Sequence, residues 1–321
     1  MFELTLQNLL SPMVLFFVLG LAAALARSDL SVPEAVARLL ALYLLISIGF
    51  RGGVEVAHHG FTMQLTLTVL SGLLLSFSLP FLAYGYLKRA TRLNTSDAAA
   101  VAAHYGSISA VTFVAVTSVL NQLGIGFDGY LVAVAAAMET PAIMAAMLIA
   151  KRTAAGSESH LGLVRHIAFN GSIVTLLGAF VIGAITGNRG MATLKPFIID
   201  AFPGFLCLFL LDMGLVAGRG LTQGWRTLSP AICLFAIGMP LCSAALASAL
   251  AFAIGLSIGS AAVLMTLAAS ASYIAVPAAM RLALPEANIA IALTLSLGIT
   301  FPFNLTIGIP LYIAAAERVV G

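Results

Sequence analysis

The feature that most constrains this chain is a succession of long apolar stretches with few charges between them. Of its 321 residues, 61% are hydrophobic and only 8% are charged, whereas about a quarter of the residues in a soluble domain are charged. Apolar surface on this scale faces lipid, where each element must satisfy its own backbone hydrogen bonds. The stretches are continuous rather than alternating, so they predict an all-α polytopic membrane protein and not a β-barrel.

About ten spans are predicted from these stretches. They fall at 11–27, 33–51, 62–87, 96–120, 128–150, 164–187, 196–218, 228–254, 258–282 and 287–315. Ten spans place eleven basic residues on the loops of one side, namely Arg27, Arg38, Lys88, Arg89, Arg92, Lys151, Arg152, Arg165, Arg219, Arg226 and Arg281. The opposite side and the tails hold four, namely Arg51, Arg189, Lys195 and Arg318. Since positive charge stays in the cytoplasm, both termini are predicted to lie outside, in a cell inner membrane.

An internal repeat divides the chain into two halves. Three matches carry it: Phe17–Gly20 with Phe180–Gly183 at an offset of 163, then Leu45–Gly49 with Leu210–Gly214 and Ser107–Val111 with Ser272–Val276 at 165. The predicted organisation is a first five-helix repeat at 1–151, a short cytoplasmic linker at 152–163 and a second repeat at 164–321. Five is an odd number, so the second half is inverted relative to the first. Inverted repeats are typical of secondary carriers, whose sites lie where the halves meet.

Two of the predicted spans are interrupted by polar turns in symmetry-related places. Gly106–Ser109 interrupts the fourth span, and Ser270–Tyr273, followed by Pro277, interrupts the ninth. Ser and Gly offer the helix backbone alternative conformations, and Pro removes an amide. Facing half-helix N-termini at membrane depth would present free N–H groups and positive dipole ends to an anion. The alternative is that these small residues only allow close contact between helices.

Ionisable residues inside spans are the second indication of function, because each is costly in lipid. Glu139 precedes Pro141 and aligns with Thr300 in the second half, and it is the first candidate for a coupling-ion ligand or proton carrier. Its alternative role is to cap a helix end near the surface. Asp212 is a weaker candidate, with a polar contact at an interface as the alternative. His104 is a lone histidine, and such a residue is more often a hydrogen-bonded interior group than a proton relay.

Motifs for other functions are absent or lie in the wrong context. Residues 124–129 fit GxGxxG but follow no strand, and the chain has no P-loop, HExxH or GxSxG sequence. No basic, aromatic-rich face indicates nucleic-acid binding. The three cysteines lie inside apolar stretches without metal or redox spacing, so they are interpreted as packing residues. The sequence therefore predicts neither an enzyme nor a cofactor or metal site, apart from a coupling ion.

Several of these segments resemble one family, the sodium-dependent bicarbonate transporters first described in cyanobacteria. The resemblance is carried by Tyr105–Thr112, Met138–Ala142 and Ala268–Tyr273, with its continuation through Pro277, Arg281 and Leu284–Asn288. It implies ten helices in two inverted repeats, a core and a gate domain, a homotrimer, and elevator-like transport of bicarbonate with Na⁺ between the two broken helices. It also implies a PII-like regulatory partner, although the linker, long in the cyanobacterial members, is short here.

The motifs and the resemblance together give the predicted site. Its substrate-binding residues are Gly106, Ser107, Ser109, Thr112, Ser270, Ser272 and Tyr273, and its coupling-ion residues are Glu139, Ser109 and Ser272. Tyr273 stands where the family usually carries an aspartate, and Ala110 and Val111 stand where Gly and Ser are expected. A proton-coupled or uncoupled carrier of another small anion or carboxylate therefore remains an alternative. An anion channel or a non-transporting sensor is a second alternative, although isolated polar turns favour a carrier over a continuous pore.

Overall fold

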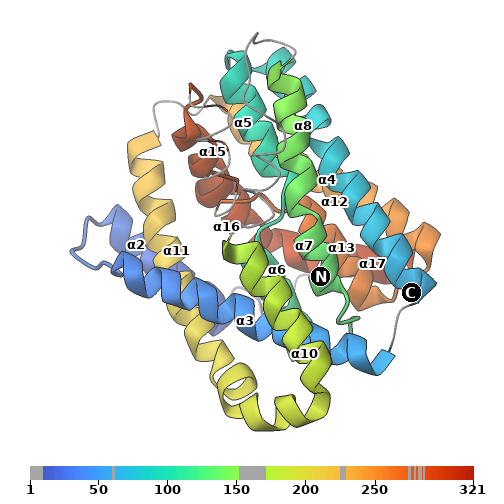
Figure 1. The fold of residues 1–321 in the computed structure, drawn as a ribbon. Helices are drawn as coiled ribbons and strands as arrows, with labels where there is room; N and C mark the ends of the chain where they lie inside the picture. Colours follow the sequence, from blue (N-terminus) through green and yellow to red (C-terminus); the bar gives the residue numbers. More distant parts are fainter. Residues whose placement is uncertain are drawn as a thin grey trace.

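The computed structural model describes residues 10–59, 62–151, 171–224, 229–273, 276–277, 280, 284 and 286–321. Every element in this part of the chain is a helix, and none is a strand (Figure 1). The predicted linker at 152–163 lies outside the described residues. The all-α prediction is confirmed.

The helices follow the predicted order of spans. Before the linker they are α2 (Pro12–Leu25), α3 (Glu34–His59), α4 (Met63–Ala90), α5 (Thr95–Gly106), α6 (Ala110–Gln122), α7 (Leu131–Ala137) and α8 (Glu139–Lys151). After it come α10 (Gly171–Lys195), α11 (Phe202–Gly224), α12 (Pro230–Ile254), α13 (Ile258–Ala269), α15 (Ile289–Leu295), α16 (Phe301–Phe303) and α17 (Ile309–Val319). Three π-helical turns complete the set: η1 (Pro196–Asp200), η3 (Ser296–Thr300) and η4 (Asn304–Gly308).

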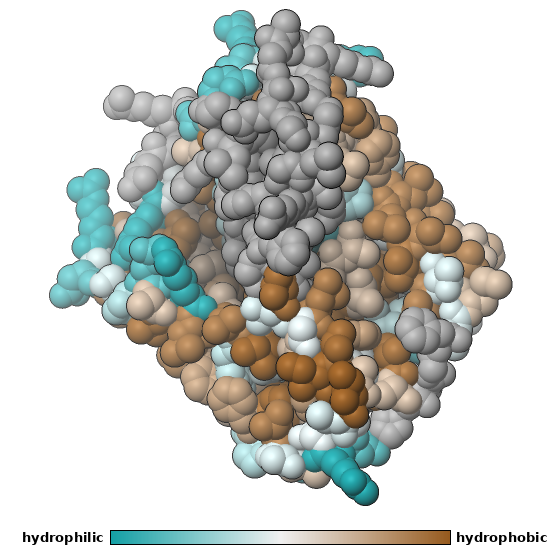
Figure 2. Space-filling view, viewed as in Figure 1, coloured by the Kyte–Doolittle hydropathy of each residue, from teal (hydrophilic) through white to brown (hydrophobic). Residues whose placement is uncertain are grey.

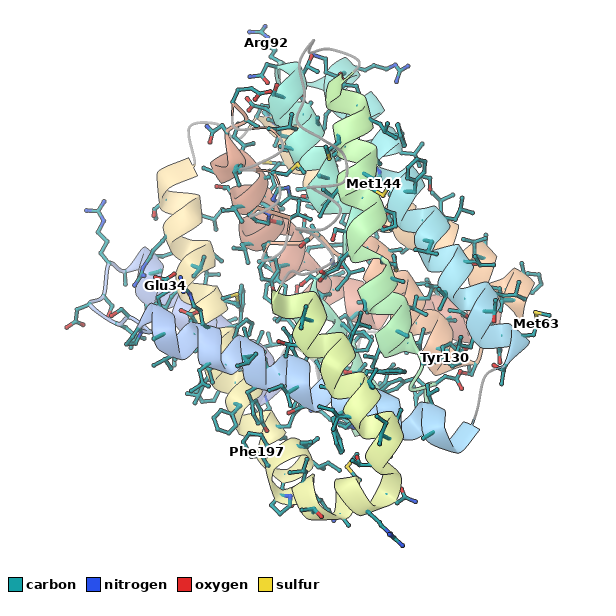
Figure 3. The ribbon with its side chains drawn as sticks, viewed as in Figure 1. Glu34, Met63, Arg92, Tyr130, Met144 and Phe197 are labelled. Carbon is teal, nitrogen blue, oxygen red and sulfur yellow. The ribbon has the colours of Figure 1, made fainter. Side chains whose placement is uncertain are left out.

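Seven segments of the described chain are long and apolar enough to cross a membrane. They are Glu34–Val54, Met63–Ala90, Thr95–Gln122, Leu131–Ile149, Phe202–Thr222, Pro230–Ile254 and Ile289–Val319, and two shorter apolar helices are Pro12–Leu25 and Ile258–Ala269. Apolar side chains cover a broad part of the visible face, and hydrophilic side chains gather toward the edges of the molecule (Figure 2). Arg92 lies toward one end of the molecule and Phe197 toward the opposite end (Figure 3). The chain is thus a multi-pass membrane protein, and the count of ten stays a prediction.

Four helices form a panel at one side of the molecule, which we call the four-helix panel: α2, α3, α10 and α11 (Figure 1). In it α3 packs along α10 and α11 packs along α2. Glycines allow these contacts, because a Cβ at Gly20 or Gly53 would lie closer than 3.0 Å to a backbone oxygen of the facing helix. Such small residues let membrane helices pack backbone to backbone.

The remaining helices form the second group, the core bundle, made of α4 to α8, α12, α13 and the continuous segment α15 to α17. Here α4 packs on α5 and α8, and α12 packs on α13 and α4. Pro80 and Pro240 lie inside α4 and α12 respectively. Each removes one backbone N–H and so leaves the carbonyl four residues earlier without its helical donor. Both helices continue through their prolines, and the Pro80 ring lies against Gly106 of α5.

Candidate substrate site

The first predicted interruption is present between α5 and α6. Helix α5 ends at Gly106, and α6 begins at Ala110 after an extended turn. Ser109 caps α6, accepting a hydrogen bond from the N–H of Thr112 at 3.2 Å. Gly106 packs so closely on Pro80 that a Cβ would lie closer than 3.0 Å to the proline ring. The Gly-Ser sequence therefore ends one helix against α4 and starts the next.

The second interruption follows α13, which ends at Ala269 with Ser270 as its C-cap. The two interruptions cross and bind each other. The N–H of Ser109 donates to the Ser270 hydroxyl at 2.8 Å, and the N–H of Ser272 donates to the His104 carbonyl at 2.8 Å. The Ser270 hydroxyl in turn donates to Leu267 at 2.7 Å. The polar turns thus satisfy part of each other's backbone in the interior of the protein.

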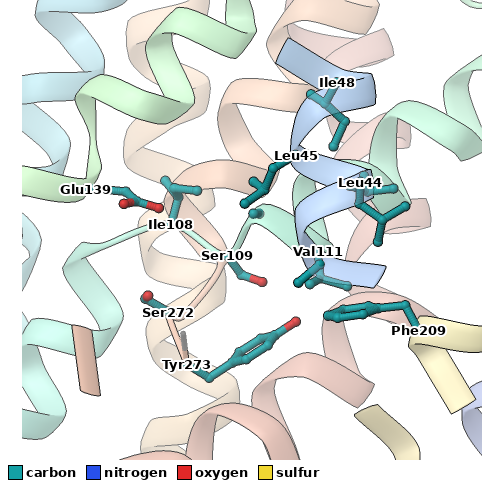
Figure 4. A pocket seen from close by; sticks show the side chains of 13 residues that line it. Leu44, Leu45, Ile48, Ile108, Ser109, Val111, Glu139, Phe209, Ser272 and Tyr273 are labelled. Atoms are coloured by element: carbon teal, nitrogen blue, oxygen red, sulfur yellow. The ribbon is translucent and has the colours of Figure 1, made fainter. Parts of the chain in front are cut away.

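A cavity of about 30 Å³ lies beside this crossing. One enclosed water needs about 10–15 Å³, so the cavity suits a small solute and not a large metabolite. Its lining residues are Ala41, Leu44, Leu45, Ile48, Ile108, Ser109, Ala110, Val111, Val114, Glu139, Phe209, Ser272 and Tyr273 (Figure 4). The hydroxyls and the carboxylate in this lining all come from the core bundle, whereas α3 and α11 contribute only apolar side chains.

Several polar atoms at the crossing are buried without a protein partner. Oε2 of Glu139 and the hydroxyl of Tyr273 have no hydrogen bond, although these residues are only 7% and 8% exposed. The Ser107 hydroxyl is also unpartnered, and so is Nε2 of His104, whose Nδ1 lies 2.6 Å from the Ala100 carbonyl. Buried polar groups in proteins are nearly always hydrogen-bonded. Several exceptions gathered at one crossing therefore indicate a place for a ligand.

The structure divides the predicted site residues into two groups. Four of them line the cavity: Ser109, Glu139, Ser272 and Tyr273. The other four, Gly106, Ser107, Thr112 and Ser270, are buried around the crossing without lining the cavity. Asp212 lies on α11 outside the lining and is 7% exposed.

The apolar wall of the cavity was missed by sequence reasoning. It consists of Ala41, Leu44, Leu45 and Ile48 on α3, with Phe209 on α11. Leucines and isoleucines in an apolar span carry no individual signal. The repeat match at 45–49 and 210–214 pointed to the same helices without indicating a wall of a pocket.

Many apolar helices, with two interruptions beside a pocket, define a multi-pass α-helical membrane protein. The family model of the Na⁺-dependent bicarbonate transporter superfamily matches residues 12–317. The chain therefore belongs to this superfamily, and the predicted family is confirmed. A comparison with curated proteins finds no significant match.

Proposed function

We propose that the chain is a sodium-coupled secondary active transporter of bicarbonate or a similar small anion, which binds between the two broken helices. The observation that carries this proposal is the cavity at the crossing, lined on one side by unpartnered polar groups and on the other by an apolar wall. The size of the cavity suits a small anion, and the name of the superfamily indicates bicarbonate as the substrate.

The anion-binding side of the proposal is the start of α6. The first N–H groups of an α-helix have no intrahelical acceptor and carry the positive end of its dipole. Ala110 and Val111 occupy these positions and line the cavity. The hydroxyls of Ser109, Ser272 and Tyr273 add donors to the same space. These groups suit the oxygens of a small planar monoanion.

The cation-binding side of the proposal is the end of α5 together with Glu139. Ala103 of α5 and Ile143 of α8 belong to one packed cluster. Ser107 follows Ala103 by one turn, and Glu139 precedes Ile143 by one turn, so both lie near the crossing. A carboxylate, hydroxyls and helix-terminal carbonyls are the oxygen ligands that hard cations take. We assign the coupling ion to Glu139, with Ser109 and Ser272 as further ligands.

Reciprocal glycine contacts in the four-helix panel support an inverted repeat. In one helix pair, Gly20 abuts the Leu211 carbonyl, and Gly214 abuts the Phe17 carbonyl. The other pair repeats this arrangement, with Gly183 against the Phe50 carbonyl and Gly53 against the Phe180 carbonyl. In all four contacts the carbonyl belongs to the residue three positions before the facing glycine.

These contacts also give a register for the two halves. They relate Gly20 to Gly183 at an offset of 163, and Gly53 to Gly214 at 161. The second value differs by one helical turn from the 165 of the sequence match. The proposal retains the halves at 1–151 and 164–321, a homotrimer, external termini in an inner membrane, and movement of the core bundle along the panel.

The test is uptake of labelled bicarbonate into proteoliposomes, with an inward sodium gradient or with choline in its place. We expect saturable accumulation with sodium only, and we expect Glu139→Gln to remove the sodium dependence. No uptake by folded protein under either gradient would overturn the proposed substrate. Uptake that does not saturate would indicate a channel, and sodium dependence that survives in Glu139→Gln would move the cation elsewhere.

The apolar wall favours a second candidate substrate, a small carboxylate with an apolar substituent. Leu44, Leu45 and Phe209 cannot hydrogen-bond the third oxygen of bicarbonate, and a buried polar group without a partner is penalised. Acetate has nearly the shape of bicarbonate, with a methyl group in place of the hydroxyl. Uptake of labelled acetate in the same assay decides between the two substrates. If the methyl group packs against the apolar wall, acetate is transported better than bicarbonate.

A further inference from the structure

Two π-helical turns in the tenth predicted span place polar side chains in the middle of the core bundle. Turn η3 ends at Thr300 and turn η4 begins at Asn304, with the short helix α16 between them. Both side chains are fully buried, and neither lines the cavity. π-Helical turns are rare and frequently lie at functional sites, so the contacts of these two residues indicate what the turns do.

Thr300 joins the end of α5 to α12. Its hydroxyl donates to the Ala236 carbonyl at 2.7 Å, and it lies 2.6 Å from the Tyr105 hydroxyl. A threonine hydroxyl has one proton, so Tyr105 donates and Thr300 accepts. Ala236 is four residues before Pro240, and its carbonyl therefore lacks the helical donor. Thr300 supplies that missing donor and at the same time binds the residue directly before Gly106.

Asn304 performs the corresponding task at the end of α13. Its amide nitrogen donates to the Ala269 carbonyl at 2.8 Å, and its amide oxygen accepts from Tyr312 at 2.9 Å. Ala269 is the last residue of α13, where carbonyls have no intrahelical donor. The amide is thus held in one orientation and caps the half-helix that leads into Ser270.

Phe301, between these two residues, contacts the site itself. Its ring packs edge-on against Tyr273 with centroids 5.8 Å apart, and against Phe17 of α2 at 5.3 Å. Three consecutive turns of one span therefore touch the end of α5, the Tyr273 ring and the end of α13. No other span of the described chain forms side-chain hydrogen bonds to the terminal residues of both half-helices.

We propose that Thr300 and Asn304 are positioning residues for the substrate site: Thr300 fixes the end of α5 through Tyr105, and Asn304 fixes the end of α13 through Ala269. This inference rests on the proposed function, because the crossing that they position is the proposed binding site. They act through the two half-helices, since neither touches the cavity. Loss of either bond changes the relative position of Ser109 and Ser272, and therefore the affinity for the anion.

The first test compares Thr300→Val, Thr300→Ser and the control Thr306→Val in the uptake assay. Thr306 lies in the same segment, and its hydroxyl bonds only to Pro302 in its own helix at 2.7 Å. We expect Thr300→Val to raise KM about tenfold, the equivalent of about 1.4 kcal/mol, with little change in maximal rate per folded molecule. Thr300→Ser restores KM, and Thr306→Val leaves it unchanged. A loss of folded protein at unchanged KM overturns the proposal.

The second test does not depend on the substrate. Hydrogen–deuterium exchange of the purified protein is measured over residues 103–109 and 267–273. We expect Thr300→Val to raise exchange in the first segment, Asn304→Ala to raise it in the second, and Thr306→Val to change neither. Equal exchange in all variants overturns the positioning role. If the variants show these exchange differences while the wild-type protein transports no bicarbonate, the proposed function alone is overturned.

Discussion

The four-helix panel has close glycine contacts between paired helices, whereas the core bundle combines glycine contacts with hydrogen bonds from buried side chains. In the panel, glycines bring helix backbones into direct contact, as at Gly20 against Leu211. In the core bundle, buried side chains bridge helices by hydrogen bonds, as Thr300 does between Tyr105 and Ala236. Backbone packing depends on shape alone, whereas hydrogen bonds fix distances and directions.

This difference matches what each region contributes to the cavity. The panel supplies an apolar wall that binds nothing in a fixed direction, and the core bundle supplies the polar groups. A wall without directional bonds can be displaced from the substrate without breaking hydrogen bonds. Polar ligands, in contrast, have to keep their mutual geometry. The comparison therefore predicts that panel substitutions change stability, while substitutions at the crossing in the core bundle change the site.

The largest effect is expected for Gly53→Ala in the panel. A Cβ at this position would lie closer than 3.0 Å to the Phe180 carbonyl and to the Ala184 nitrogen. Both are backbone atoms, so α3 and α10 must separate, and we expect a loss of about 3 kcal/mol of stability. The measurement is thermal unfolding in detergent. Gly178→Ala on α10 is the control, because nothing lies within 4 Å of its Cβ and alanine favours helices by up to ~1 kcal/mol. Equal melting of both variants would contradict the close packing.

A smaller effect on stability and a larger one on transport are expected for Ser270→Ala in the core bundle. The substitution leaves the buried N–H of Ser109 without its acceptor, which costs about 1–3 kcal/mol. We expect KM for the transported anion to rise, since Ser109 starts α6 and lines the cavity. The control is Ser296→Ala, whose buried hydroxyl bonds only within its own helix, to Ala292 and Leu293. A KM for Ser270→Ala that equals the control value would show that the crossing does not hold the site.

The same contrast explains how far the sequence predicts this molecule. Hydropathy predicts the spans because each residue that faces lipid has to be apolar. Gly and Ser at 106–109 predict the interruption because these residues weaken any helix. Glu139 is predicted to be functional because a carboxylate is costly in an apolar span. These features are local. The structure confirms the helices and shows the interruption, and it places Glu139 in the lining of the cavity, where its function stays a prediction.

Non-local features could not be predicted in this way. Leu44 and Phe209 form the wall of the cavity only because α3 and α11 face the crossing. Thr300 aligns with Glu139 in the sequence repeat, but its bond to the carbonyl that Pro240 leaves free depends on the packing of two distant spans. Apolar residues and buried hydroxyls acquire their roles from tertiary contacts, and one sequence does not contain that information.

Two hydrogen bonds, which we call latches, connect the two halves of the chain within the core bundle. Asp97, near the start of α5, accepts from the N–H of Asn288 at 2.7 Å. Ser260, in the same position of α13, donates to Asp128 at 2.6 Å. Each latch joins the start of a half-helix to the loop before a span of the other half of the chain. The two latches lie in different parts of the molecule. Arg92, five residues before Asp97, and Tyr130, two residues after Asp128, are well separated in Figure 3.

The smallest effect is expected for Asp97→Asn, which breaks one latch without changing its shape. Asp97 also accepts from the Asn94 amide at 2.8 Å through its second oxygen, and an amide with a single oxygen cannot satisfy both donors. We expect a loss of about 1 kcal/mol of stability, and a similar loss for Ser260→Ala. Because the latches are distant and share no partner, the double variant should show the sum of the two losses. A double variant no less stable than either single one would mean that the two ends of the core bundle open together, and that its rigidity depends on both latches as one unit.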